Sequence, residues 1–227
     1  MNRRWVYQAL IVGLAMVFVI TTVGTASAQY RARYRHRAPT QMDLVLEGGV
    51  AVPYGDLGAD FFGTAKGAGA ETGYDVGVRF RQRWPSGWAL SPSFHYENFG
   101  DFVGLFDAAA GTDIKVSTSI YRWEVAVQYF FPTSESEIQP FVTVGPGLYV
   151  NRYRDQLSTE RHSVLNTFNA FGVSLGGGIR VSWFELAAEY HLNYFSTARL
   201  PGSDVFSTSY DWNYLTVTAG FALPLQE

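Results

Sequence analysis

Cysteine is absent from this chain of 227 residues, which excludes disulfide bonds and thiolate-bound metal ions. The four histidines, His36, His95, His162 and His191, do not have the spacing of a metal-ligand set. After the first 20 residues there is no run of about 18 apolar residues, so a bundle of transmembrane helices is not expected. Charged residues make up only 16% of the chain, whereas 14 tyrosines and 6 tryptophans are of the type that suits membrane–water interfaces.

The first 28 residues have the features of a secretory leader. Arg3 and Arg4 precede an apolar run at 9–20, and Ala26-Ser27-Ala28 matches the small-residue pattern of a cleavage site. The apolar run is short for a membrane span, so we predict a signal peptide over 1–28 that is cleaved before Gln29. The alternative is an uncleaved membrane anchor. The arginines that follow the leader favour this alternative, because positive charge at that place opposes export.

Residues 29–42 are predicted to form a basic tail in the periplasm. Arginine recurs there at Arg31, Arg33, Arg35 and Arg37. Such a run is typical of a solvated, unfolded segment; alternatively it contacts anionic headgroups or the cell wall. The 17 basic residues of the chain include the two leader arginines, so 15 remain against 20 acidic residues after cleavage. This acidic balance gives no basis for nucleic-acid binding.

Eight segments alternate apolar and polar side chains, which is the period of a β-strand with one apolar face. The clearest segment runs from Gly73 to Trp84, where the apolar Val76 and Val78 alternate with the charged Asp75 and Arg79. The predicted strands are 43–52, 73–84, 88–98, 116–131, 139–150, 167–181, 184–195 and 211–225.

Long and short connections alternate between these strands. The long connections are 53–72, 99–115, 151–166 and 196–210, and the short ones are 85–87, 132–138 and 182–183. A transmembrane barrel has its long loops at one rim, its short turns at the other, and its apolar face toward lipid. The sequence therefore predicts an all-β, eight-stranded antiparallel up-and-down transmembrane β-barrel over 43–227. The alternative is a soluble lipocalin-type barrel, with the apolar face inside and the charges outside.

Several segments resemble the small outer-membrane β-barrels of the OmpA-transmembrane, OmpX and OmpW type. They are GGVAVPYGDLG from Gly48, QPFVTVGPGLYV from Gln139, GVSLGGGIRV from Gly172, and LTVTAGFALPL from Leu215. The resemblance implies an outer-membrane location in a Gram-negative-type bacterium. It also implies contact with membrane lipid, lipopolysaccharide and the barrel-assembly machinery. In the last segment, Thr218, Gly220, Leu223 and Leu225 match the assembly signal of such barrels.

Ten charged residues are predicted to face the lumen because each lies on the polar face of its alternating strand. They are Glu47, Asp75, Arg79, Arg81, Glu97, Arg122, Glu124, Arg180, Glu185 and Glu189. The interior of an eight-stranded barrel is only wide enough for side chains to fill it, and buried charges are costly unless they are paired. We therefore expect a closed network of ion pairs. The alternative is a narrow, gated channel for ions or small solutes.

An enzymatic function is not expected. A lipid hydrolase needs a nucleophile, a base and an orienting acid within hydrogen-bond reach. His191 and Glu189 share the lumenal parity, whereas Ser196 has the opposite parity. No catalytic, metal or cofactor residue is assigned. The predicted function is a contribution to envelope integrity, with surface interactions, contacts with host molecules among them, made through four long outer loops.

Overall fold

A computed structural model describes residues 40–58, 68–100, 102–107, 112–132, 137–157, 163–197 and 208–225. The predicted signal peptide and nearly all of the predicted basic tail lie outside these residues. In the part of the chain that the structure describes, no helix has the length and apolar character needed to cross a membrane.

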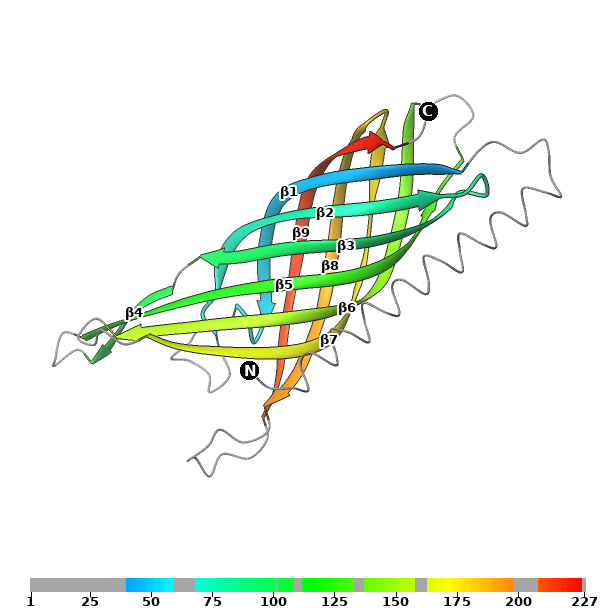
Figure 1. Cartoon of the computed structure of the whole chain (residues 1–227). Coiled ribbons are helices and arrows are strands. Elements are labelled where there is room, and N and C mark those ends of the chain that lie inside the picture. Colours follow the sequence, from blue (N-terminus) through cyan, green and yellow to red (C-terminus); the bar gives the residue numbers. More distant parts are fainter. Residues whose placement is uncertain are drawn as a thin grey trace. The chain divides into compact units, whose positions relative to one another are not determined.

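The described residues form nine antiparallel strands, and eight of them close into a barrel (Figure 1). The strands are β1 (Gln41–Gly55), β2 (Glu71–Arg83), β3 (Trp88–Gly100), β4 (Phe102–Asp107), β5 (Thr112–Phe130), β6 (Ile138–Leu157), β7 (Ser163–Val181), β8 (Phe184–Thr197) and β9 (Thr208–Pro224). Apart from β3 and β4, neighbours in sequence pair with each other. β1 pairs with β9, and β4 pairs with β5 beyond the end of β3. Pairing of β3 with β5 completes the ring, so β4 is a short continuation of β3. The predicted eight-stranded antiparallel barrel is confirmed.

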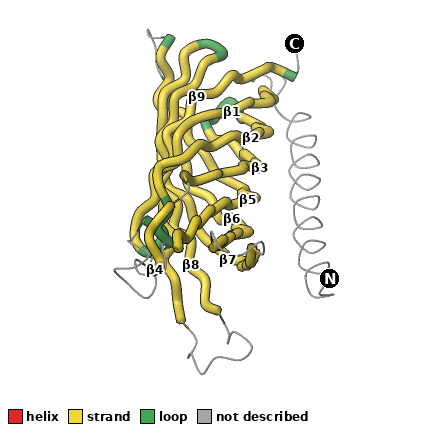
Figure 2. Tube along the Cα trace, turned by 90° about the vertical axis from the view of Figure 1, so that its left-hand side faces the viewer, coloured by secondary structure: helices red, strands yellow, loops and turns green. Residues whose placement is uncertain are grey.

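The two rims of the barrel differ. One rim, called here the short-turn end, carries the connections 84–87, 131–137 and 182–183. The opposite rim is called the loop end. The connections 84–87 and 182–183 are described in full and are short. Described loop residues are green in Figure 2 and strands are yellow. The reversal from β7 to β8 is so tight that Ser182 adopts a positive φ of 56°.

The strands are longer than predicted at the loop end. The intervals 99–115 and 151–166 were expected to be loops, yet β4, the first residues of β5, the last residues of β6 and the first residues of β7 occupy most of them. β6 has 20 residues, whereas about 9–11 residues are enough to cross a bilayer. The expectation of four long loops is therefore wrong for these two intervals. Backbone pairing continues there although the outward apolar pattern has ended.

The outer face of the barrel is apolar and the inner face is polar. On β7, Phe171 and Leu175 point outward and are 62% and 63% exposed. On β2, Val76 and Val78 are exposed, whereas Arg79 is 1% exposed. The lipocalin-type alternative, in which charges cover the outside, is therefore wrong.

Candidate functional site

A small apolar layer lies in the lumen at the short-turn end. Ala89, Phe130, Phe141 and Ala187 are buried together, and the rings of Phe130 and Phe141 have centroids 5.1 Å apart. The guanidinium of Arg81 lies 5.1 Å from the centroid of the Phe130 ring, so a cation–π contact joins this layer to the charges above it.

A first group of charges, the short-turn cluster, lies above this layer. It contains Asp43, Arg81, Arg180 and Glu185. The two Nη atoms of Arg81 bind the two carboxylate oxygens of Glu185, and its Nε lies 3.4 Å from Asp43. Arg180 Nη1 donates to Asp43 at 2.6 Å. Two cations and two carboxylates thus neutralise each other at this level, as buried charges require.

A second group, the central cluster, is organised around Arg122. Its Nε donates to Glu97 at 2.9 Å, and its Nη1 donates to Glu124 at 2.8 Å. The same guanidinium lies 4.0 Å from Asp75 and 3.8 Å from Glu189. β5 therefore places one arginine among carboxylates from β2, β3, β8 and its own strand.

Arg79 and His95 complete the central cluster. Arg79 Nη2 donates to Glu189 at 2.9 Å, and its Nε lies 3.3 Å from Glu47. His95 has Nε2 3.2 Å from Glu47 and Nδ1 3.1 Å from Asp75. An uncharged imidazole would direct a lone pair at one of these two carboxylates, so the geometry fits the doubly protonated ring.

Carboxylates outnumber cations in the central cluster. Its members are Glu47, Asp75, Glu97, Glu124 and Glu189, against Arg79, His95 and Arg122, and each of these eight residues is 8% exposed or less. The middle of the lumen therefore holds more acidic than basic groups, so not every carboxyl group has a cation of its own.

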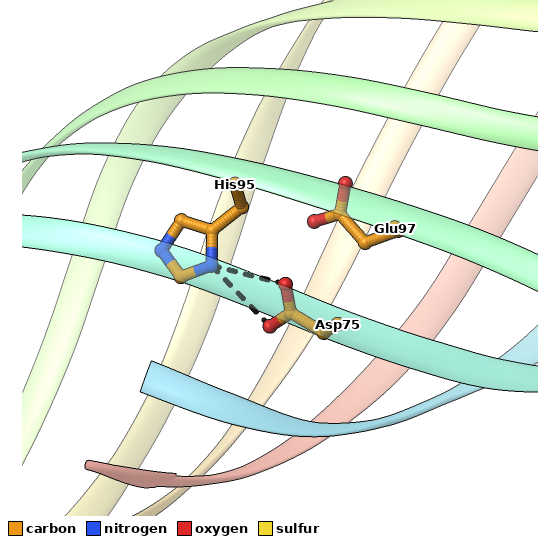
Figure 3. A group of neighbouring side chains, drawn as sticks. All are labelled: Asp75, His95 and Glu97. Carbon is orange, nitrogen blue, oxygen red and sulfur yellow. Dashed lines mark hydrogen bonds and ion pairs between the residues drawn. The ribbon is translucent and has the colours of Figure 1, made fainter. Parts of the chain in front are cut away.

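Three of these residues have the spacing of a metal-ligand group. Asp75, His95 and Glu97 offer ligand atoms within 4.8 Å of one another, and Figure 3 shows Asp75 hydrogen-bonded to the imidazole. The guanidinium of Arg122, however, already donates to Glu97 and lies beside Asp75. A divalent ion would be placed next to that positive charge, so the residues fit an ion-pair cluster better than a metal site.

An aromatic layer covers the central cluster toward the loop end. Its buried members are Ala51, Leu57, Ala68, Ala70, Phe99, Ile120, Tyr149, Ala170, Trp212 and Tyr214. The Tyr214 ring has its centroid 5.6 Å from that of Phe99 and 6.4 Å from that of Tyr149. The Tyr214 hydroxyl donates to Glu97 at 3.2 Å. The layer therefore packs directly onto the charges.

Glycines on the inner wall give the large side chains room. A Cβ on Gly172 would lie 2.6 Å from the Tyr149 ring, and one on Gly178 would lie 2.7 Å from the Phe141 ring. Both glycines are on β7, which presents little side-chain volume to the lumen at these positions. The rings of Tyr149 and Phe141, both on β6, lie over this part of the wall.

The structure places the ten predicted charges as follows. Nine are buried in the two clusters, and Arg180, whose side chain is 15% exposed, lies at the short-turn rim of its cluster. Sequence reasoning missed two partners, Asp43 and His95. Asp43 has the same parity as Glu47, and His95 has the same parity as Glu97, so the lumenal side of both could be predicted. That His95 lies between Glu47 and Asp75 depends on how the strands pair, which the sequence did not indicate.

The residues considered for hydrolase chemistry do not form a catalytic arrangement in the described part of the chain. His191 is buried, and its Nε2 lies 3.0 Å from the Thr216 hydroxyl. Glu189 binds Arg79, and the side chain of Ser196 lies outside the described residues. His191 stacks on Tyr214 with ring centroids 4.5 Å apart, which is a packing contact.

The residues of the predicted assembly signal lie on both faces of β9 and just beyond it. Thr218 is buried in the lumen, whereas Leu223 and Leu225 are 46% and 50% exposed. A Cβ on Gly220 would lie 3.2 Å from the side chain of Glu47. The role of this segment in assembly stays a prediction.

Comparison with known proteins adds the following. No protein-family profile matches the chain. No curated protein matches it either. Among solved structures, Neisserial surface protein A (NspA) is similar at 18% identity over 80% of this chain and 96% of that chain, with a TM-score of 0.45. Ail, the attachment invasion locus protein of Yersinia pestis, solved with the heparin analogue sucrose octasulfate, is 11% identical over 82% of this chain and 100% of that chain, with a TM-score of 0.44. A major outer membrane protein from Thermus thermophilus is 12% identical over 80% of this chain and 99% of that chain, with a TM-score of 0.45.

These structures are small outer-membrane proteins, as the resemblance in the sequence implies. For this chain the strand pairing itself gives the fold, a closed antiparallel barrel of eight wall strands. The resemblance to small outer-membrane barrels is therefore confirmed at the level of the fold.

Proposed function

We propose that this protein is a non-enzymatic outer-membrane barrel whose lumen is closed to solutes. It contributes to envelope integrity, and it makes surface contacts through its loop end. The observation that carries this proposal is the layered lumen, in which two ion-pair clusters lie between two apolar layers. Eight strands enclose a space that side chains can fill, and here large side chains from most of the wall strands enter it.

The outer wall supports the membrane location. An exposed apolar surface that surrounds a barrel with a charged interior is stable only against lipid. Outward aromatic residues occur near the short turns, such as Trp88, whose ring centroid lies 4.9 Å from that of Tyr129. Aromatic residues at this position are typical of the membrane interface. In the proposed orientation the short turns face the periplasm, the loop end faces outward, and the wall contacts membrane lipid and lipopolysaccharide.

The proposal includes an assembly route. The chain is exported behind its leader and inserted by the barrel-assembly machinery, which reads the last strand. The buried charges support insertion of a folded barrel, because Arg79 meets Glu189, and Arg81 meets Glu185, only when strands far apart in sequence have come together.

Planar-bilayer conductance of the purified protein tests the closed lumen. The unmodified barrel is expected to show no steady conductance. A double variant, Arg122→Ala with Tyr149→Ala, removes the centre of the central cluster and the ring above it. It is expected to pass cations in preference to anions, because carboxylates then dominate the lining.

Val125→Ala, on the outer face of the same strand as Arg122, is the matched control and should show no steady conductance. Resistance of each protein to unfolding in detergent shows that the barrel is intact. A large and stable conductance in the unmodified protein would contradict the closed lumen, and the lumenal charges would then form the lining of a channel.

A further inference from the structure

A polar groove interrupts the outer wall toward the loop end. It encloses about 210 Å³ and is lined by Tyr96, Asn98, Ser117, Ser119, Tyr121, Arg152 and Arg154. These residues come from the adjacent strands β3, β5 and β6. Closer to the short-turn end, the outward positions of the same strands are mostly apolar, so the groove marks the edge of the apolar band.

The strand register brings the polar side chains of the groove into rows. Asn98 lies opposite Ser119, and Ser119 lies opposite Arg152. One row further toward the loop end, Ser117 lies opposite Arg154. Residues two apart on a strand point to the same side and are separated by roughly 7 Å. The side chains of Arg152 and Arg154 therefore extend from the same face of β6 as neighbours.

The two arginines have no acidic partner among the described residues. Arg152 lies over the Tyr121 ring at 4.7 Å from its centroid and donates to the Tyr121 hydroxyl at 3.3 Å. Both arginines are exposed, and the seven lining residues include no carboxylate. The lining residues thus present two cations together with hydroxyl and amide groups, which is the donor set that binds a phosphate.

Apolar aromatic surface adjoins the groove on its short-turn side. Phe94 and Trp123 lie two residues from Tyr96 and Tyr121 on the same strands, and their ring centroids are 4.4 Å apart. Trp123 is 47% exposed. A ligand with an anionic head and an apolar tail would match both surfaces at once.

We propose that this groove binds the phosphate of a membrane lipid headgroup from the leaflet at the loop end. The phosphate lies between Arg152 and Arg154, and the acyl chains lie against Phe94 and Trp123. This inference rests on the proposed function, because it requires the outer wall to face lipid. It adds one defined lipid site, with a preference for a headgroup that carries an anionic phosphate, to a wall that otherwise contacts lipid without selection; phosphatidylglycerol serves as the probe for that headgroup.

Fluorescence of Trp123 reports on this site. The full chain is reconstituted in phosphatidylcholine vesicles that carry a minor fraction of lipid brominated in its acyl chains, either phosphatidylglycerol or phosphatidylcholine. Bromine quenches nearby indoles. Brominated phosphatidylglycerol is expected to quench more strongly than brominated phosphatidylcholine at the same fraction.

The Trp123→Phe variant identifies the source of this difference. Among the described tryptophans, Trp84, Trp88 and Trp183 lie at the short-turn end and Trp212 is buried. The excess quenching by phosphatidylglycerol should therefore disappear when Trp123 is replaced. If the excess remains, the preferred lipid lies elsewhere and the proposal is wrong.

Single variants then test the arginines. Arg152→Gln and Arg154→Gln should each lower the preference for phosphatidylglycerol about fivefold, the effect of one basic residue at an anionic surface. Arg152→Lys keeps the charge but loses the planar contact, so its preference should be intermediate. Tyr54→Glu, on the outward face of β1, changes the net charge by the same amount as Arg152→Gln and should leave the preference unchanged. Equal loss in Tyr54→Glu, or no loss in the glutamine variants, would overturn the proposal.

Two further outcomes separate the possible failures. If no brominated lipid quenches any tryptophan, the wall does not face lipid and the proposed function itself fails. If both lipids quench equally, the wall faces lipid and only the headgroup site fails. Added inorganic phosphate should not abolish the preference; if it does, the groove takes a free anion instead of a lipid headgroup.

Discussion

The imidazole of His95 occupies the space that a side chain on Gly77 would fill. The two residues are register partners on β3 and β2, and a Cβ on Gly77 would lie 2.3 Å from His95 Nδ1. That nitrogen is the atom that faces Asp75. Glycine at this position therefore allows an ion pair to lie flat against the inner wall.

Gly77→Ala is expected to displace the imidazole and lower the free energy of unfolding by about 1–3 kcal/mol, the usual cost of overpacking. Gly48→Ala is the matched control, since its Cβ would meet only the Asp75 carbonyl oxygen at 3.9 Å. Urea unfolding in lipid vesicles measures both. Equal stability of the two variants would mean that the His95 ring can move without loss.

Arg81 and Arg180 bind overlapping carboxylates but differ in burial. The Arg81 side chain is 0% exposed and that of Arg180 is 15% exposed. Arg81→Gln leaves Glu185 buried without its bidentate guanidinium partner and should lower the free energy of unfolding by about 3–5 kcal/mol. Arg180→Gln leaves Asp43 and Glu185 with Arg81 as a remaining partner, and should cost about 1–3 kcal/mol. The same unfolding titrations rank the two variants, and the reverse order would contradict the described short-turn cluster.

The depth of the apolar band can be probed by one substitution at two positions on β5. Val125 lies midway between Tyr121 and Tyr129 on the outward face, and Ser117 lies on that face near the loop end. Val125→Arg should cost about 2–4 kcal/mol, as charges at the bilayer midplane do, and Ser117→Arg about 0–1 kcal/mol. Folding into vesicles measures both. Similar costs would show that lipid does not surround β5 as proposed.

The leader prediction is tested by intact mass. The mature protein should begin at Gln29 and fractionate with the outer membrane, because Ala26-Ser27-Ala28 supplies the cleavage site. A chain that keeps residues 1–28 and fractionates with the inner membrane would instead favour the uncleaved anchor.

The alternation of side chains predicts the architecture and the inward charges because each strand has a period of two. Parity identifies Arg79 and Glu189 as lumenal, but it does not reveal that they meet. Their contact depends on how β2 and β8 are staggered around the closed ring, and no single strand encodes that stagger. The pairing of Arg122 with four carboxylates is hidden for the same reason.

Two features of the structure were not predicted from the sequence, for different reasons. The aromatic layer of Tyr149 and Tyr214 has the inward parity, yet tyrosine is also typical of the membrane interface, so composition suggested the outer wall. The strand ends at 151–157 and 163–166 lack an apolar face, so the periodic signal stops although backbone hydrogen bonding continues. Loop boundaries drawn from apolar alternation therefore mark the edge of the apolar band and not the end of the sheet.

The pairing of β1 with β9, from Asp43 with Pro224 to Gly55 with Trp212, joins the two ends of the barrel sequence. Every other wall contact joins strands that are close in sequence, so this seam carries the largest loop-closure entropy and is expected to form last. Until it forms, β1 and β9 are two open edges with unpaired backbone groups, the kind of surface that promotes aggregation. We therefore expect the rate of productive folding to depend on how quickly β9 pairs with β1.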